Sequence, residues 1–120
     1  MHSRVSNALV DELRSLLGDR VTTNPGLCEQ HGQDESFHVG QAPDAVVFPL
    51  DTGEVQGIAA ACCRRRVPMI PYGAGTSLEG QITAPHGGLC IDMSRMNQIL
   101  EVNPADLDCT VAAGVTRRQL

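Results

Sequence analysis

Residues 67–81 read VPMIPYGAGTSLEGQ, in which a short apolar run leads directly into a glycine-rich loop. Residues 44–49 form a second short apolar run that also ends at a proline. Between the two runs, apolar residues recur at helical spacing: Val55, Ile58, Ala59 and Cys62. They predict a helix, which Thr52 can cap. A strand, a helix and a second strand in this order form a unit whose strands lie parallel through a right-handed crossover. The sequence therefore predicts an α/β fold.

The loop that follows the second strand has the composition of a phosphate-binding loop. Glycine lacks the Cβ atom that keeps a ligand away from the backbone, so N–H groups around Gly73, Gly75 and Gly80 can approach an anion. Thr76 and Ser77 add two hydroxyl groups. The glycine pattern alone is equally compatible with a long turn. The residues by themselves thus indicate either an anion-binding loop or a turn on an α/β scaffold.

Spacing excludes three better-known loops. A P-loop requires Lys directly after its second glycine, where this chain has Gln81. The dinucleotide fingerprint requires a third glycine where Leu78 stands. A serine hydrolase elbow requires a glycine two positions after the serine, but Glu79 holds that position relative to Ser77. The loop is therefore none of the common nucleotide or nucleophile motifs.

The residues before this unit predict one helix and an irregular connection. An amphipathic pattern predicts a helix from about Ser6 to Leu17, closed by Gly18. Residues 22–43 are rich in glycine, proline and polar side chains, which predicts an irregular segment along the surface. Its candidates for chemistry are His31, Asp34, Glu35 and His38. No helical or strand register aims these side chains at one point, so we expect no metal site there.

The residues after the loop predict a strand and a hairpin. Residues 89–93 resemble a strand, and residues 98–102 and 107–112 flank the turn sequence NPAD at 103–106. Thr116 resembles the N-cap of a helix of which one turn is present, so we expect an α/β unit that is incomplete at the carboxy terminus. His86 lies in a turn sequence and is expected to be structural.

Composition argues against several classes of protein. The net charge of −5 and the scarcity of aromatic residues argue against a nucleic-acid partner. The basic cluster at residues 64–66 ends the predicted helix, where cations favour the helix dipole. The five cysteines include no C-x-x-C pair, which argues against a zinc site or disulfide framework and predicts small buried hydrophobes. No apolar run approaches about 20 residues, and Asp11 and Glu12 replace the apolar core of a signal peptide. We expect a cytoplasmic protein, with peripheral membrane association left open.

The glycine-rich loop and its flanks resemble a known family. The loop PYGAGTSLEG at residues 71–80, the sequence HGQDES at 31–36 and the sequence PDAVV at 43–47 are similar to the FAD-binding domain of the vanillyl-alcohol-oxidase (PCMH) type. Within that superfamily they resemble the branch that contains D-lactate dehydrogenase and the glycolate oxidase flavoprotein subunit. The resemblance implies that residues 1–42 are an amino-terminal helix and connection. Residues 43–120 would be the first part of the FAD-binding domain, with its second subdomain and the cap domain absent.

The resemblance also implies a cofactor, a reaction and a set of binding residues. FAD would bind non-covalently, because relatives with covalent flavin have His where this chain has Thr76. The reaction would be hydride transfer from C2 of a small 2-hydroxy acid to flavin N5, with electrons passing to a separate acceptor. No residue of this chain is assigned as the catalytic base. The cofactor-binding residues implied are Pro71, Tyr72, Gly73, Ala74, Gly75, Thr76, Ser77, Gly80, Gln81, Gly114 and Val115.

Two alternatives stay open at this stage. The chain can be a truncated, non-catalytic flavin-domain fragment, which predicts exposed apolar strand edges. The same FAD domain can also serve another substrate, such as 2-hydroxyglutarate. The Thr76 to Gly80 sequence favours the lactate and glycolate branch.

Overall fold

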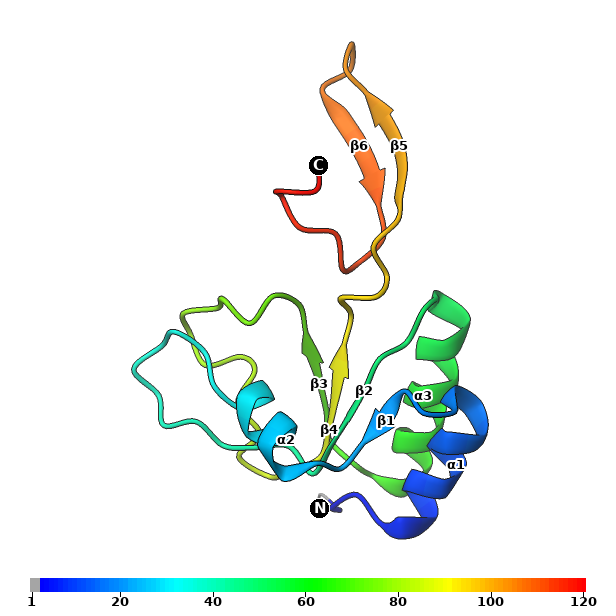
Figure 1. The fold of residues 1–120 in the computed structure, drawn as a ribbon, viewed down its shortest axis with the longest axis vertical. Coiled ribbons are helices and arrows are strands. Elements are labelled where there is room, and N and C mark those ends of the chain that lie inside the picture. Colours follow the sequence, from blue (N-terminus) through cyan, green and yellow to red (C-terminus); the bar gives the residue numbers. More distant parts are fainter. Residues whose placement is uncertain (1–2) are drawn as a thin grey trace.

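The computed structural model describes residues 3–120 as a four-stranded sheet from which a two-stranded hairpin projects (Figure 1). The strands of the sheet are β1 (Val21–Thr22), β2 (Ala45–Val47), β3 (Met69–Tyr72) and β4 (Leu89–Asp92). The hairpin consists of β5 (Ile99–Asn103) and β6 (Asp108–Val111). The helices are α1 (Asn7–Leu17), α2 (Pro25–His31) and α3 (Thr52–Arg65). This mixed architecture confirms the predicted α/β fold class.

The sheet has the order β1-β2-β4-β3. Strands β2 and β3 both pair parallel with β4, and β1 pairs antiparallel with β2. The strands that α3 connects are therefore parallel, as predicted, but β4 lies between them. Every residue of β4 is buried, as expected for a central strand. Strand β3 contains Pro71, which cannot donate a ladder hydrogen bond and therefore suits an edge.

Helices α1 and α3 cover one face of the sheet. The Ser6 side chain caps α1 by accepting a hydrogen bond from the Leu9 amide, and the helix ends before Gly18, as predicted. The predicted cap of α3 was wrong by one residue. Asp51 is the N-cap, because its carboxylate accepts from the Glu54 amide at 2.8 Å, and Thr52 is the first helical residue.

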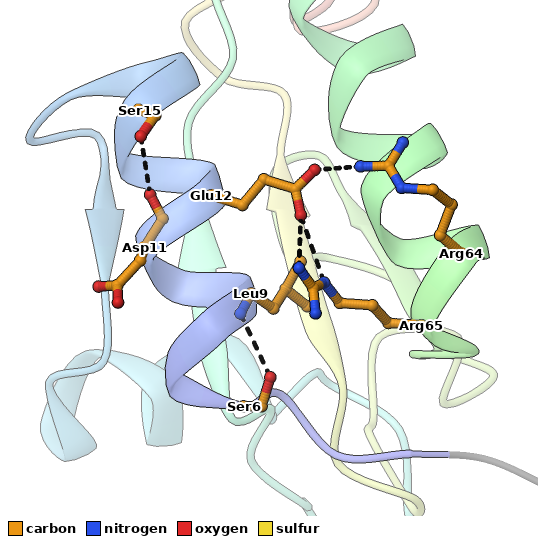
Figure 2. A network of polar contacts seen from close by, with 7 residues as sticks. All are labelled: Ser6, Leu9, Asp11, Glu12, Ser15, Arg64 and Arg65. Carbon is orange, nitrogen blue, oxygen red and sulfur yellow. Dashed lines mark hydrogen bonds and ion pairs between the residues drawn. The ribbon is translucent and has the colours of Figure 1, made fainter.

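An ion-pair network joins α1 to the end of α3. Figure 2 shows the Glu12 carboxylate of α1 reaching the guanidinium groups of Arg64 and Arg65. The Arg65 Nη2 to Glu12 Oε2 distance is 2.8 Å. Hydrogen bonding from Arg65 holds the pKa of Glu12 below its usual value, although burial opposes this. The basic cluster thus ends a helix, as predicted, and serves helix packing.

Strand residues alternate between two apolar layers. The larger core, against α1 and α3, includes Ala45, Val47, Leu89 and Ile91. The smaller core on the opposite face contains Cys28, Val46 and Cys90, with Phe48 and Tyr72 packed against it. The period of two is the expected consequence of a sheet that is buried on both faces.

Residues 22–43 are more ordered than predicted. Asn24 accepts a hydrogen bond from the Leu27 amide, Pro25 occupies the first helical position, and α2 follows as far as His31. Asparagine at the N-cap and proline at the next position are a helix-start pattern, so the prediction of an irregular segment was wrong for this part. Residues 32–43 are without helix or strand.

The hairpin confirms the predicted pair of strands, but its turn spans residues 104–107 instead of the predicted 103–106. It stands away from the sheet, and the carboxy-terminal segment folds back beside it (Figure 1). Large apolar side chains on it are exposed, including Leu100, Val102 and Leu107. Of the helices in residues 3–120, none has the length and apolarity required to cross a membrane.

Candidate functional site

The glycine-rich loop leaves the sheet at the carboxyl end of β3, the end that faces the hairpin (Figure 1). Pro71 and Tyr72 are the last two residues of β3, and Gly73 begins the loop. Burial raises the pKa of the Tyr72 hydroxyl, with smaller contributions from nearby Asp92 and Cys90. The carboxyl ends of parallel strands are where α/β sheets commonly bind ligands.

Two glycines in the loop have backbone conformations that favour glycine. Gly75 has φ +74° and Gly80 has φ +77°. A Cβ atom on Gly75 would overlap the Tyr72 hydroxyl, and one on Gly80 would lie 2.7 Å from Cδ2 of His38. Gly73 differs, since nothing lies within 4 Å of the position of its Cβ. A Cβ atom at Gly73 would therefore have room, whereas the positive φ angles and close contacts at Gly75 and Gly80 require glycine.

The loop has unused hydrogen-bond donors. Within residues 3–120, the backbone N–H groups of Gly73 to Ser77 donate to no protein acceptor. Successive free amides around positive-φ glycines form the kind of concave donor set that binds phosphate oxygens. The residues present therefore fit the anionic part of a nucleotide cofactor.

The second half of the loop is held by Asp34. Its Oδ2 accepts from the Ser77 hydroxyl at 3.0 Å and from the Gly80 amide at 3.1 Å. Its Oδ1 accepts from the amide and the hydroxyl of Ser36. Hydrogen bonding from the Ser36 side chain, followed by these other donors, lowers the pKa of Asp34 against the opposing effect of burial. A backbone bond from the Glu35 amide to the Ser77 carbonyl adds a further link at 3.3 Å.

A cavity of about 330 Å³ brings the first half of the loop together with the carboxy-terminal segment. The residues that line it are Gly73, Ala74, Thr76, Ser94, Ala113, Gly114, Val115, Thr116 and Arg117. Of the residues implied by the family resemblance, Gly73, Ala74, Thr76, Gly114 and Val115 therefore meet at one place. The others, Pro71, Tyr72, Gly75, Ser77, Gly80 and Gln81, lie outside this lining.

Gly114 and Val115 shape the cavity wall through contacts within the protein. The Gly114 amide donates to the Met96 carbonyl at 2.9 Å, and the Val115 amide donates to the Ala112 carbonyl at 3.2 Å. A Cβ atom on Gly114 would overlap the backbone carbonyl of Met93. Glycine is thus required here so that the segment after the hairpin can approach the end of β4.

A buried pair of side chains, His31 and Asp92, lies next to Tyr72, the residue that precedes the loop. His31 Nε2 is 2.8 Å from Asp92 Oδ2, and its Nδ1 is 2.9 Å from the Leu27 carbonyl oxygen. Both side chains are more than nine-tenths buried. The His31 ring also packs against Tyr72, with ring centroids 4.5 Å apart. Sequence analysis missed Asp92, although a carboxylate at the end of an apolar strand was a signal that could have drawn attention to it.

The remaining candidates have structural positions. Of His31, Asp34, Glu35 and His38, the first two make the contacts described above, and residues 3–120 contain no group of three or more metal-ligating side chains. The cysteines in this range are unpaired; Cys28, Cys62 and Cys90 are buried as predicted, whereas Cys63 and Cys109 are exposed, so the burial prediction was wrong for those two. Residues 85 and 86 form a turn, as predicted.

Three curated proteins that resemble the chain act on 2-hydroxy acids according to their names. "Probable D-lactate dehydrogenase, mitochondrial" of Danio rerio is 43% identical over 93% of this chain and 23% of its own length. A D-2-hydroxyglutarate dehydrogenase of Stutzerimonas stutzeri is 34% identical over 94% of this chain and 25% of its own length. The glycolate oxidase subunit GlcD of Bacillus subtilis is 44% identical over 61% of this chain and 16% of its own length. The chain thus spans about a quarter or less of the length of these relatives.

Solved structures share the fold. An alkyldihydroxyacetonephosphate synthase superimposes with a TM-score of 0.84 at 24% identity, over 98% of this chain and 24% of its own. A p-cresol methylhydroxylase with substrate bound gives a TM-score of 0.82 at 24% identity, over 94% of this chain and 23% of its own. The family described as "FAD binding domain" matches residues 43–120, which contain both the free-amide loop and the opposite wall of the cavity. The chain belongs to this FAD-binding domain family.

Proposed function

We propose that this chain supplies the pyrophosphate-binding part of the FAD site in an enzyme that oxidises a small D-2-hydroxy acid. The observation that carries the proposal is the run of free amides from Gly73 to Ser77, whose first half lines a cavity shared with residues 113–117. The loop backbone would donate hydrogen bonds to the pyrophosphate oxygens, and the Thr76 hydroxyl would add another donor. Gly114 and Val115 would form part of the cavity lining. Their amides, which donate to carbonyl groups of the protein, would not bind the cofactor.

The remaining residues of the proposed cofactor set act indirectly. Pro71 and Tyr72 fix the point where the loop leaves the sheet, and Gly75 allows its tight turn. Ser77 and Gly80 are tied to Asp34, which holds the second half of the loop in place. The Gln81 side chain accepts from the Glu79 amide at 3.2 Å, so it stabilises the end of the loop.

We propose that FAD binds here without a covalent bond. Among the described residues that line the cavity, none is a His, Cys or Tyr that could attach to the flavin, and Thr76 is a poor nucleophile. When bound, FAD supplies a hydride acceptor for the hydrogen on C2 of a 2-hydroxy acid. The contribution of this chain is to hold and orient the cofactor, and we assign it no catalytic base.

The names of the relatives support the substrate class. A D-lactate dehydrogenase and a glycolate oxidase subunit are among them, which favours a small 2-hydroxy acid as the substrate. A separate electron acceptor is part of the proposal. The D-2-hydroxyglutarate dehydrogenase match over 94% of the chain keeps a larger dicarboxylic substrate as the second candidate. Turnover of D-lactate, glycolate and D-2-hydroxyglutarate with an artificial electron acceptor, by the protein that carries this chain, distinguishes these candidates.

Titration of the chain with FAD tests the cofactor site. Flavin fluorescence and the flavin retained after gel filtration would be measured for the wild type and for Gly73→Val. A Cβ atom at Gly73 would meet no protein atom within 4 Å, so we expect the variant to fold, while its methyl groups obstruct the backbone donors. Ala105→Val, in the exposed hairpin turn, is the matched control. We expect retention by the wild type and the control, and loss of retention by Gly73→Val.

Equal retention by Gly73→Val and the wild type would mean that FAD does not use this loop, which would count against the proposal. No retention by the folded wild-type chain would mean that the chain alone does not complete the site, and the same comparison would then be made in the longer protein that carries this chain.

A further inference from the structure

The charge distribution around the cavity is one-sided. Among the described residues that line it, none is Asp or Glu, and Arg117 is the single charged side chain. Thr76 and Ser94 add hydroxyl groups to the lining, whereas the Thr116 hydroxyl already donates to Gln119 Oε1 at 3.2 Å. The amides of Gly73 and Ala74, which also line the cavity, are free. A cavity with this composition in a chain of net charge −5 is suited to an anion.

Arg117 has no protein partner in the part of the chain that the structure describes. Some other arginines are engaged, for example Arg20 with Glu54. Arg14, Arg66 and Arg118 also have no side-chain partner in the described residues, but they do not line the cavity. An unpaired guanidinium beside free amides and hydroxyl groups is an incomplete set of donors. Its planar geometry, with five N–H donors, matches phosphate oxygens closely.

The backbone around Arg117 is held in a defined turn. The Gln119 amide donates to the Thr116 carbonyl at 3.1 Å, and the Gln119 side chain accepts from the Thr116 amide at 2.9 Å. This turn separates two neighbouring arginines, because Arg117 lines the cavity and Arg118 does not. The chain therefore provides its own control for the effect of charge at this location.

We infer that Arg117 is a specificity-determining residue that binds the diphosphate group of the dinucleotide together with the free amides of Gly73, Ala74 and Thr76, which line the same cavity. This inference rests on the proposed function for the identity of the ligand. Arg117 neutralises part of the diphosphate charge, and the loop amides and hydroxyl groups take the remaining oxygens. The site thus distinguishes a flavin that carries a diphosphate from riboflavin, which carries no phosphate.

The test compares Arg117→Gln with Arg118→Gln in the same chain. Affinities for FAD and riboflavin would be measured from flavin fluorescence, and affinity for inorganic pyrophosphate by calorimetry. A single charge-assisted contact at an exposed site corresponds to about a tenfold change in Kd. We expect Arg117→Gln to weaken FAD and pyrophosphate binding by about this factor and to leave any riboflavin binding unchanged. Arg118→Gln should resemble the wild type, and Arg117→Lys should recover part of the loss.

Ionic strength gives an independent readout. The difference between wild type and Arg117→Gln should shrink as salt is raised, because screening weakens an exposed contact between charges. Equal losses for Arg117→Gln and Arg118→Gln, or equal losses of FAD and riboflavin affinity, would overturn the inference. If the protein that carries this chain does not bind FAD, the proposed function fails, and the pyrophosphate measurement then tests the inference about Arg117 separately. Pyrophosphate binding that weakens in Arg117→Gln would support the inference. A wild-type chain that binds no pyrophosphate would refute it.

Discussion

Removing one member of the His31–Asp92 pair should strongly destabilise the fold. In His31→Leu, the buried Asp92 carboxylate would keep the hydrogen bond that its Oδ1 accepts from the Ser94 amide at 2.8 Å. Its Oδ2 would lose the contact with His31. Breaking a buried pair by removing one partner typically costs about 3–5 kcal/mol. The variant would also lose the ring contacts of His31 with Tyr72 and Phe48. We therefore expect a loss of at least about 3 kcal/mol, or a decrease in Tm of roughly 10 °C or more.

A double-mutant cycle separates the pair from ordinary packing. His31→Leu, Asp92→Leu and the double variant would be compared by urea denaturation, with the slope m required to stay constant. Replacing both partners with apolar side chains removes the uncompensated buried charge. The double variant should therefore be more stable than the sum of the single losses predicts, by about 2 kcal/mol. Additive losses would refute the interpretation of His31 and Asp92 as a coupled pair.

The remaining predictions concern pH, thiol reactivity and the loop. Hydrogen bonding from Arg20 lowers the pKa of Glu54 from 4.5 to about 2. The stability that this contact contributes is therefore complete above pH 4.5 and should be lost as the pH falls toward 2. In Glu54→Gln, the urea concentration at the midpoint of unfolding should depend less on pH in this range. Iodoacetamide on the native chain should label Cys63 and Cys109 and spare the three buried thiols, and mass spectrometry that finds buried sites labelled first would contradict the described packing. Asp34→Ala should weaken FAD binding while leaving the urea midpoint nearly unchanged, because it frees the loop without opening the core; unchanged FAD affinity would show that this contact is dispensable.

Periodic patterns made most of the fold predictable. The helix at residues 7–17 and the hairpin at residues 99–111 follow from local signals, namely apolar spacing, a closing glycine and a proline-containing turn. Helix α2 was missed because Asn24-Pro25-Gly26 resembles a turn. The same residues begin a helix when the following side chains, such as Cys28, find a core to bury them.

The position of β4 and the supports of the loop could not be predicted from local patterns. Strand order depends on which apolar run is buried on both faces, and a single sequence does not pair strands. The Asp34 contact with Ser77 spans 43 positions, and the His31 contact with Asp92 spans 61. Glycine spacing and the family resemblance predicted where the loop lies, but neither indicated which distant carboxylates hold it.

These two distant contacts explain how a glycine-rich loop can have free donors and a defined shape. Flexible glycines lose much conformational entropy when a ligand orders them, so a loop held in advance binds more tightly. Asp34 fixes the second half of the loop through side-chain and backbone donors. The His31–Asp92 pair supports its start through Tyr72. Both supports leave the amides between Gly73 and Ser77 unbonded, so the loop is ordered by contacts that do not compete with an anion for its donors.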